Sequence, residues 1–380
     1  MLYFALSVTL ALGYSLIIGW YLYHWKKLPI WSPSSTTLPT TSISVLIPVR
    51  NEAATIEACL RSILAQRYPH YEIWVIDDHS EDQTAHLVKQ LMIHHPQLNL
   101  IDLAHFAKAQ PTQSYKKLAL QVGIQHSKGA LIVTTDGDCV VPPDWLQLFA
   151  SFYEATGAKF IAAPVAFHQE QALLGRFQTL DFMGMMVVTG AGIQSGKMHM
   201  SNGANLAYTR EAFDAVGGFQ QIDHLASGDD LFLMQKIAQQ FPGQIYFLKN
   251  SAATVKTAPQ ATLREFIQQR LRWGTKSASY QEVFITFILA VVFFFCWNIL
   301  LALCFIPWLG WWALVAFGVQ LGVKLVADFV FLRTAAAFFG RRDLLRSFFG
   351  AQWLHLAYII GIGTASNLIK QYEWKGRKVR

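Results

Sequence analysis

The chain has 380 residues, of which 53% are hydrophobic and 14% are charged, and its formal net charge is +7. Soluble domains carry about 25% charged residues, so this composition argues against an ordinary cytosolic protein. The high hydrophobic content also excludes an intrinsically disordered chain. A basic, apolar chain is more typical of a protein at an anionic membrane surface than of a nucleic-acid-binding module. The four cysteines form no C-x-x-C pair, which argues against a disulfide framework and a zinc site.

The N-terminal segment, residues 1–23, contains no charged side chain and is long enough to span a bilayer as a helix. A cleaved signal peptide needs a basic start, which this segment does not have. We therefore predict an uncleaved transmembrane anchor over residues 1–23. His24, Lys26 and Lys27 follow it, so the positive-inside rule places this end in the cytoplasm. Residues 24–41 are predicted to be a linker, because their second half is rich in Pro, Ser and Thr.

A second apolar region, residues 283–369, contains about three hydrophobic segments. Residues 283–323 carry no charge and are long enough for two spans, and a third segment runs over 348–369. Lys324 and Asp328 are four residues apart near the end of the second span, so they can pair on one helical face. Three crossings would leave the tail outside, whereas its basic residues favour the inside. The number of crossings therefore stays open, and one segment can be re-entrant or interfacial.

The middle of the chain, residues 42–282, alternates short apolar runs with helical patterns. The predicted strands are residues 43–48, 71–76, 98–103 and 130–135, and the predicted helices are residues 55–65, 82–92, 116–126 and 142–153. Four such alternations predict an α/β fold with a mostly parallel, Rossmann-like sheet and helices on both faces. The apolar residues 173–188 are expected to form an interfacial or core helix, because Arg176 and Asp181 interrupt them.

Acidic residues follow three of the predicted strands, where parallel sheets bind their ligands. Glu52 follows the first strand, Asp77 and Asp78 follow the second, and Asp136 and Asp138 follow the fourth. A single acidic strand end is explained by a turn or a helix cap. Three that converge on one edge repel one another and favour a bound cation. Because two carboxylates offer hard oxygen ligands, the sequence predicts a site for Mg²⁺ or Mn²⁺.

Two later motifs add candidate functional groups. Asp229 and Asp230 precede an apolar helical run, so each is either a helix N-cap or a general base for an acceptor hydroxyl. Gln269, Arg272 and Trp273 have the i, i+3, i+4 spacing that places them on one helical face. A basic interfacial helix explains this second motif in part. Its arginine can also hold a diphosphate, and its tryptophan can stack on a sugar or lipid acceptor.

Together, these motifs resemble those of the membrane-bound family 2 glycosyltransferases, which have the GT-A fold. The family pattern is a strand ending in P-x-x-N-E, followed by D-D-x-S, D-x-D, E-D or D-D, and Q-x-x-R-W. The matching residues here are Pro48/Asn51/Glu52, Asp77-Asp78-His79-Ser80, Asp136-Gly137-Asp138, Asp229-Asp230 and Gln269-Arg270-Leu271-Arg272-Trp273. The order and spacing match over roughly residues 42–275, and the flanking apolar segments also look like this family.

The resemblance implies a role for each matched residue. The implied donor-binding residues are Pro48, Glu52, Asp77, Asp78, Lys117, Asp136, Gln269 and Arg272. Asp138, with Asp136, would bind the metal that bridges the donor diphosphate. Asp230, next to Asp229, would be the base in a single-displacement, inverting transfer, and Trp273 would border the acceptor. Many family members have Glu at the position of Asp229. The aspartate keeps the negative charge, but its side chain is shorter.

The expected activity is that of a membrane-bound hexosyltransferase, which moves a sugar from a nucleotide-sugar donor, a UDP-sugar first of all, to a lipid or glycan acceptor. One alternative is a processive polysaccharide synthase, which needs a helix bundle that can host a polymer channel. Another is a non-catalytic membrane scaffold, which would have lost the acidic motifs. The basic tail, residues 370–380, is expected to contact membrane lipids, and no nucleic-acid partner is expected. The expected location is the bacterial inner (cytoplasmic) membrane, with the catalytic domain in the cytoplasm.

Overall fold

The structure, a computed structural model, describes residues 2–33, 38–107, 114–225, 227–275, 280, 282–368, 372–374 and 377–379. The chain forms two compact units that alternate along the sequence. The membrane unit consists of Met1–Leu28, Gln169–Met198 and Pro259–Tyr372, and the α/β unit consists of Pro29–His168, His199–Ala258 and Glu373–Arg380. Parts of the predicted linker and of the predicted basic tail lie outside the described residues.

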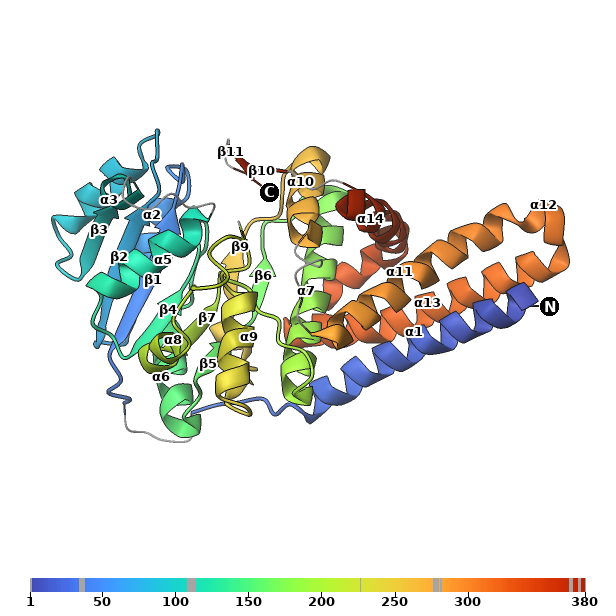
Figure 1. The fold of residues 1–380 in the computed structure, drawn as a ribbon, viewed down its shortest axis with the longest axis horizontal. Helices are drawn as coiled ribbons and strands as arrows, with labels where there is room; N and C mark the ends of the chain where they lie inside the picture. Colours follow the sequence, from blue (N-terminus) through green and yellow to red (C-terminus); the bar gives the residue numbers. More distant parts are fainter. Residues whose placement is uncertain are drawn as a thin grey trace. The chain divides into compact units, whose positions relative to one another are not determined.

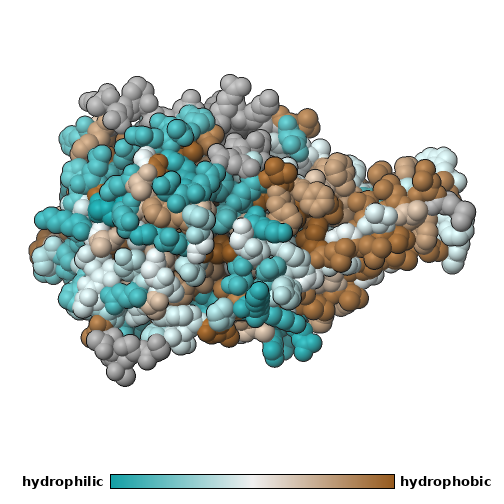
Figure 2. Space-filling model, turned by 60° about the horizontal axis from the view of Figure 1, so that its bottom comes forward, coloured by the Kyte–Doolittle hydropathy of each residue, from teal (hydrophilic) through white to brown (hydrophobic). Residues whose placement is uncertain are grey.

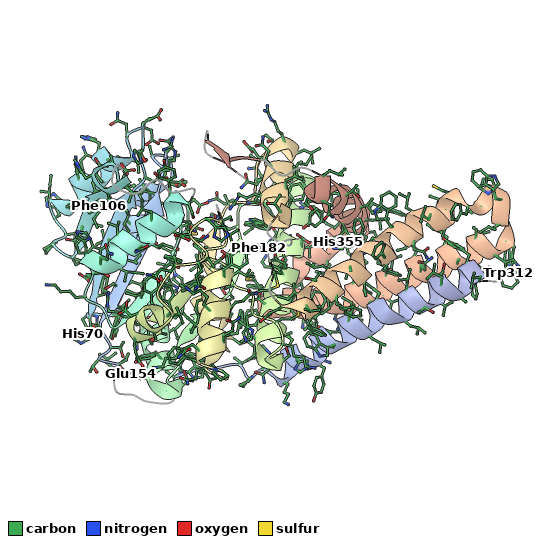
Figure 3. The ribbon with its side chains drawn as sticks, in the orientation of Figure 1. His70, Phe106, Glu154, Phe182, Trp312 and His355 are labelled. Carbon is green, nitrogen blue, oxygen red and sulfur yellow. The ribbon has the colours of Figure 1, made fainter. Side chains whose placement is uncertain are left out.

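Three long helices of the membrane unit are apolar enough to cross a membrane: α1 (Leu2–Lys27), α11 (Val283–Cys304) and α13 (Trp311–Phe338). They lie side by side in Figure 1, and their surface is mostly hydrophobic in Figure 2. The short helix α12 (Ile306–Leu309) joins α11 to α13. Trp312 lies at this end of the bundle in Figure 3, and Trp308 and Trp311 beside it in sequence are also exposed. Exposed tryptophans are typical of a membrane boundary.

Three further helices of the membrane unit run across the long ones: α7 (Ala172–Ser195), α10 (Leu263–Gly274) and α14 (Phe348–Leu368). In Figure 1, α7 and α10 stand upright and α14 is seen nearly end-on, whereas the long helices lie lengthwise. The apolar segment 173–188 is thus part of α7, which packs on α1, α13 and α14. The 3₁₀ helix η3 (Arg342–Ser347) leads into α14, which is not among the three helices that are long and apolar enough to cross a membrane. Helix α14 runs across the three long helices, which is the direction expected of an interfacial helix.

The α/β unit is built on a seven-stranded sheet in the order β3-β2-β1-β4-β7-β5-β8. Its strands are β1 (Ile43–Val49), β2 (Tyr71–Asp77), β3 (Leu98–Asp102), β4 (Leu131–Thr134), β5 (Phe160–Ala162), β7 (Leu206–Thr209) and β8 (Ile245–Phe247). The first four pair in parallel, whereas β7 pairs antiparallel with β4 and β5. A small sheet pairs β6 (Val165–Phe167) with β9 (Val255–Thr257), and the C-terminal strands β10 (Tyr372–Trp374) and β11 (Arg377–Val379) form another. The predicted α/β class with a mostly parallel sheet is confirmed.

Helices accompany this sheet, and those over residues 56–64, 84–92, 115–126 and 145–156 lie where the sequence spacing predicts them. The helices are α2 (Ile56–Leu64), α3 (Thr84–Met92), α4 (Ala104–Ala107), α5 (Tyr115–His126), α6 (Trp145–Thr156), α8 (Arg210–Ala215) and α9 (Leu231–Gln240), with a 3₁₀ turn η1 (Ser251–Ala253). In α2, for example, Ile56, Leu60 and Ile63 follow helical spacing and are fully buried. The helix predicted from residue 142 begins only at α6, because Pro143 disfavours a helical conformation of Pro142.

Asn205, just before β7, is a buried polar residue that joins three parts of the α/β unit. Its Oδ1 accepts a hydrogen bond from the indole nitrogen of Trp145 at 2.9 Å. Its Nδ2 donates to the carbonyl oxygens of Pro164 at 2.7 Å and Ala253 at 2.9 Å. A buried amide with partners on both atoms fixes the segment around it, because Asn205 is 0% exposed and solvent cannot reach it to replace those bonds. The segment fixed here is the loop before β7, which connects this central strand to the site described below.

We predict that Asn205→Ala lowers the stability of the protein by about 3 kcal/mol, because three buried polar groups each lose a hydrogen bond and only the Pro164 carbonyl keeps another, from the N–H of Val255. The measurement is thermal unfolding of the full chain in detergent. Asn99→Ala is the matched control, since Asn99 is only half-buried on β3 and water can replace its hydrogen bonds. Equal unfolding temperatures for the two variants would contradict the role assigned to Asn205.

Candidate functional site

The loops after β1 and β2 hold each other in place at the carboxyl edge of the sheet. Arg50 donates hydrogen bonds to the carbonyl oxygens of Asp78 at 3.0 Å and His79 at 3.1 Å. The hydroxyl of Ser80 accepts the backbone N–H of Asn51 at 2.9 Å. Asn51 and His79 both have positive φ angles, of 53° and 55°, a conformation that costs free energy and needs support. The P-x-x-N-E and D-D-x-S motifs are therefore one structural element.

The two acids of the second motif are nearly buried, with Asp77 6% and Asp78 4% exposed. Oδ1 of Asp77 accepts the backbone N–H of Ser80 at 3.2 Å, and Oδ1 of Asp78 lies 2.8 Å from Nδ1 of His79. Burial raises the pKa of Asp77, and its hydrogen bonds to Ser80 oppose that rise. Both acids lie at the end of β2, where the sequence places them. Pro48 lies beside them on β1, paired in register with Ile76 of β2.

Asp136 and Asp138 come together in the loop after β4. A ligand atom of each lies within 4.8 Å of the other and of the Cys139 thiol, which donates to Oδ1 of Asp138 at 3.5 Å. A Cβ atom at Gly137 would lie 2.9 Å from Val49 and 3.2 Å from Cγ of Glu52. Only glycine therefore lets this loop come so close to β1. The contact also brings Glu52 to the D-x-D motif.

These donors suit a hard divalent cation. Burial raises the pKa of Cys139, and the neighbouring Asp138 adds to the rise. The thiol is therefore protonated at neutral pH before any cation binds. The remaining ligand atoms are carboxylate oxygens of Asp136 and Asp138, which Mg²⁺ and Mn²⁺ prefer. The residues fit the cation that the sequence predicts.

Lys116 is a residue of the site that the sequence analysis missed. Its Nζ lies 2.8 Å from Oδ1 of Asp136 and 3.4 Å from Oδ2 of Asp229. Burial alone would lower the pKa of Lys116, but the attraction of Asp136 and Asp229 outweighs it and raises that pKa. The lysine therefore stays charged and ties the D-x-D motif to the D-D motif.

Lys117, which the resemblance places in the nucleotide pocket, has a different environment. Its Nζ donates to the carbonyl oxygens of Ile222 at 2.6 Å, Leu225 at 2.5 Å and Ser227 at 3.0 Å. These three bonds use all three protons of the ammonium group. Lys117 therefore holds the loop that leads to the D-D motif, and its contact with a nucleotide stays a prediction. Consecutive lysines on a helix point about 100° apart, so only one of the pair faces the acids.

Asp230 is the N-cap of α9, as one of the two readings of this motif expects. Its Oδ1 accepts the N–H of Leu231 at 2.8 Å, and its Oδ2 accepts the N–H of Gly203 at 3.0 Å. These bonds fix the orientation of the carboxylate at the site. A carboxylate oxygen has two lone pairs, so a cap of this kind does not exclude a second donor such as an acceptor hydroxyl. The capping and catalytic roles of Asp230 are compatible.

The Q-x-x-R-W residues, Gln269, Arg272 and Trp273, lie on α10 and belong to the membrane unit, unlike the acidic motifs. Helix α10 begins with a capping box between Thr262 and Glu265. The Oε1 atom of Gln269 is buried, and within the described part of the chain it has no hydrogen-bond partner. A buried polar atom of this kind needs a partner, which a ligand can supply.

Arg270, inside the same motif, is a second residue that the sequence analysis missed. It is 1% exposed, and its Nη2 lies 2.9 Å from Oδ2 of Asp181 on α7. Its guanidinium carbon lies 4.4 Å from the ring centroid of Trp273 and 5.4 Å from that of Tyr358 on α14. The ion pair and the stacked rings fix α10 against α7 and α14. One ring face of Trp273 is thus occupied by Arg270.

The sequence matches, over residues 5–378, the family described as glycosyl transferase family 21. The chain belongs to glycosyl transferase family 21. The enzyme class expected from the motifs, a membrane-type glycosyltransferase with a GT-A fold, is confirmed, although the matched family is number 21 and the motifs were compared with family 2. The acidic motifs expected of such an enzyme are all present in the sequence.

Two curated relatives are glycosyltransferases that match part of this family 21 chain. It is 29% identical over 199 residues to glycosyltransferase AglE of Haloferax volcanii. The matched segment covers 52% of this chain and 60% of the relative. To beta-monoglucosyldiacylglycerol synthase of Synechocystis sp. it is 26% identical over 202 residues. This second matched segment covers 51% of this chain and 40% of the relative. The chain thus spans about half the length of these relatives.

A solved structure shows the same fold over almost the whole chain. It is the mannosyltransferase PcManGT from Pyrobaculum calidifontis in complex with GDP-Man and Mn²⁺, with a TM-score of 0.58 and 21% sequence identity. The alignment covers 96% of this chain and 99% of that one. At this level of identity the likeness supports the fold alone.

We predict that Lys116→Met destabilises the protein by about 2 kcal/mol, because it leaves two carboxylates without their shared cation. The cost stays below that of a fully buried pair, since the Lys116 side chain is 22% exposed. Mn²⁺ should raise the unfolding temperature of this variant more than that of the parent, because its acid cluster is more negative. Lys89→Met, at an exposed position of α3, is the control. An equal Mn²⁺ effect in all three proteins would contradict the bridging role.

We predict that Arg270→Met destabilises the membrane unit by about 3–5 kcal/mol, because Asp181 is left buried and unpaired. The double variant Arg270→Met/Asp181→Leu should recover a large part of that loss. A double-mutant cycle on thermal unfolding in detergent measures the coupling between the two residues. If the two single losses simply add in the double variant, the ion pair does not fix α10.

Proposed function

We propose that this glycosyltransferase moves a single sugar from a nucleotide-sugar donor to a hydroxyl group of a membrane lipid, with inversion by single displacement. The observation that carries the proposal is the acid cluster at the sheet edge, where Lys116 joins Asp136 to Asp229. The three helices that are apolar enough to cross a membrane support an acceptor that lies in the membrane. The name of the relative from Synechocystis, a beta-monoglucosyldiacylglycerol synthase, describes a glycolipid product.

The donor is proposed to be a UDP-sugar that binds where the loops after β1 and β2 meet. Glu52, Asp77 and Asp78 are the acids of this edge, and carboxylates of this kind accept hydrogen bonds from ribose hydroxyls and base N–H groups. Pro48, which lies beside these acids on β1, is proposed to line the donor site. The complex of PcManGT contains a GDP-sugar, so GDP-sugars are the second donor class to test.

Asp138 and Asp136 would hold the divalent cation, Mg²⁺ or Mn²⁺. When bound, the cation neutralises charge on the diphosphate leaving group. Lys116 lies against the same acids and adds a fixed positive charge at the D-x-D motif. Gln269 and Arg272 on α10 are proposed to donate hydrogen bonds to the diphosphate, which stabilises it as it leaves.

Asp230 is proposed to be the base. The oxygen of the acceptor hydroxyl forms a bond to the anomeric carbon while the bond from that carbon to the diphosphate breaks. The hydroxyl proton passes to the carboxylate of Asp230, whose orientation is set by Gly203 and Leu231. Asp229, in contact with Lys116, balances charge, and Trp273 borders the acceptor through the ring face opposite Arg270.

The proposed orientation has the α/β unit in the cytoplasm of a bacterial cell, at the inner membrane. His24, Lys26 and Lys27 lie in the last turn of α1, which the positive-inside rule places in the cytoplasm. Helices α11 and α13 cross as a pair, so the chain returns to the side from which it left. If α14 lies in the interface, the basic tail also stays in the cytoplasm, which removes the conflict noted in the sequence.

The test is a product screen with the purified full chain in detergent, labelled UDP- and GDP-sugars, Mg²⁺ or Mn²⁺, and diacylglycerol or a bacterial lipid extract. We expect one glycolipid with a single sugar of inverted anomeric configuration. Asp138→Asn and Asp230→Asn should each lower turnover by about 100-fold or more, as the loss of a base or metal ligand does. Asp144→Asn, at a solvent-accessible ion pair with Arg67, is the control and should keep full turnover.

Other outcomes of the screen would replace the proposal. A ladder of products would identify a processive polysaccharide synthase. A product with retained configuration would exclude single displacement and the role of Asp230 as its base. Full turnover in Asp230→Asn with loss in Asp229→Asn would move the base to the neighbouring residue. Absence of both turnover and nucleotide binding would favour the non-catalytic scaffold.

A further inference from the structure

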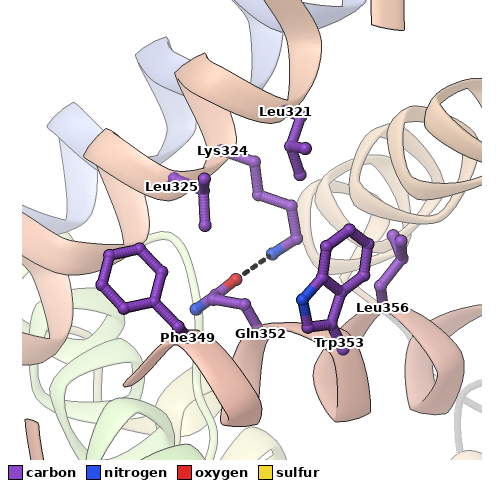
Figure 4. A pocket seen from close by; sticks show the side chains of 7 residues that line it. All are labelled: Leu321, Lys324, Leu325, Phe349, Gln352, Trp353 and Leu356. Carbon is purple, nitrogen blue, oxygen red and sulfur yellow. Dashed lines mark hydrogen bonds between the residues drawn. The ribbon is translucent and has the colours of Figure 1, made fainter. Parts of the chain in front are cut away.

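A small pocket of about 60 Å³ opens in the membrane unit where α13 meets α14. Figure 4 shows Leu321, Lys324 and Leu325 of α13 on one side and Phe349, Gln352 and Trp353 of α14 on the other. The rim consists of large exposed rings, since Phe349 is 70% and Trp353 57% exposed. In a chain whose long helices suit a membrane, such exposed apolar residues face lipid. The pocket is therefore open to the bilayer.

The depth of this pocket follows from the tryptophans at the other end of α13. Trp311 and Trp312 mark one membrane boundary, and Lys324 lies 13 residues farther along the same helix, at about 20 Å for a rise of 1.5 Å per residue. The hydrocarbon core is about 30 Å thick. Lys324 thus lies in the leaflet on the side of α14, below the level of charged headgroups.

The floor of the pocket is polar but carries no net charge. Lys324 is 1% exposed, and its three protons go to a carboxylate oxygen of Asp328, to Oε1 of Gln352 at 3.0 Å and to Nδ1 of His355 at 3.2 Å. Asp328 in turn accepts the hydroxyl of Tyr14 on α1. All three protons of the lysine ammonium group are thus used within the protein, and its charge is neutralised by Asp328. An anionic headgroup gains little at such a floor.

Gln352 supplies a donor that the protein does not use. Its side chain is 6% exposed, and its amide oxygen must face Lys324, because an ammonium group only donates. The amide nitrogen then points away from Lys324, toward Phe349, as Figure 4 shows. Among the described residues it donates no hydrogen bond. An amide donor between apolar walls is complementary to a neutral oxygen acceptor on an otherwise apolar molecule.

We propose that this pocket binds the polar end of an uncharged lipid, with one hydroxyl or ester carbonyl oxygen accepting a hydrogen bond from Nε2 of Gln352. The inference rests on the proposed function, because it takes that lipid to be the acceptor. The volume is well below the roughly 150 Å³ of a cavity that binds benzene, so it admits one oxygen and its neighbouring carbons but no sugar ring. The acyl chains would lie along the exposed apolar side of α13.

The helix that forms this pocket also supports the Q-x-x-R-W helix. Tyr358, one turn beyond the pocket residues of α14, packs edge-on against Phe266 at 5.8 Å and lies 5.4 Å from Arg270. Arg270 stacks on Trp273, which is proposed to border the acceptor. A lipid seated on α14 is therefore held by the same helix that positions the acceptor-side residue of α10.

The experiment uses the full chain in phosphatidylcholine nanodiscs with a diazirine-bearing diacylglycerol, and peptide mapping locates the photolabel. Three variants are compared: Leu325→Phe fills the pocket, Gln352→Met removes the donor, and Val326→Phe is the matched control on the exposed side of α13, where the residue is 68% exposed. The Michaelis constants for lipid acceptor and for donor are measured on the same preparations.

We expect the label on residues 321–325 and 349–356, and at least a fivefold loss of it in Leu325→Phe. Gln352→Met should raise the KM for the lipid about three- to tenfold, the value of one neutral hydrogen bond, with the donor KM unchanged. Val326→Phe should behave as the parent. An excess of anionic phosphatidylglycerol should not displace the probe.

Three results would overturn the inference: labelling elsewhere, equal effects of Leu325→Phe and Val326→Phe, or displacement by phosphatidylglycerol. The labelling is read without turnover, so it separates the pocket from the proposed function. If the pocket is labelled but no lipid receives a sugar, the lipid site stands and the lipid-transferase proposal fails. If glycolipid is made but both phenylalanine variants keep the parent KM, the function stands and the pocket is not the acceptor site.

Discussion

The repulsion between carboxylates at one edge of the sheet is the constraint on which the α/β unit depends. Asp136, Asp138, Asp229 and Asp230 are brought together by strand ends and a helix start, and such a cluster is unstable unless cations or N–H groups compensate it. The protein supplies both kinds of compensation. Lys116 bridges two of the acids, and backbone N–H groups hold Asp230. The excess of negative charge that remains suits a divalent cation.

The membrane unit meets the same constraint with pairs instead of a cluster. Arg270 pairs with Asp181 and Lys324 pairs with Asp328, and in each case aromatic or amide groups complete the surroundings. A buried pair adds little net stability but is costly to break, so it favours one arrangement of helices over others. The first pair joins α10 to α7, and Lys324, which pairs with Asp328 within α13, joins α13 to α14 through Gln352. A bundle held by apolar contacts alone, in which lipid competes for the same surfaces, has less to fix its register.

The sequence predicts the sheet well because parallel strands buried on both faces leave short apolar runs, and the acids after those runs mark the ligand edge. It does not distinguish Lys116 from Lys117, because the phase of α5 against the sheet decides which lysine meets the acids. It also misses Arg270, since a basic residue in an amphipathic helix is ordinarily exposed and only the position of Asp181 shows that it is buried. For α14, apolar composition suggested a span, whereas its crosswise direction depends on packing against α7 and α10.

The two units alternate along the chain, and this order has a consequence for the chemistry. The acidic motifs lie in the α/β unit, whereas Gln269, Arg272 and Trp273 lie on a helix whose ion pair and aromatic contacts are all within the membrane unit. The residues proposed to bind the leaving diphosphate are therefore held by the same helices that are proposed to hold the lipid. In the proposed mechanism, the metal ligands and the base therefore come from residues of one unit and the diphosphate donors from residues of the other.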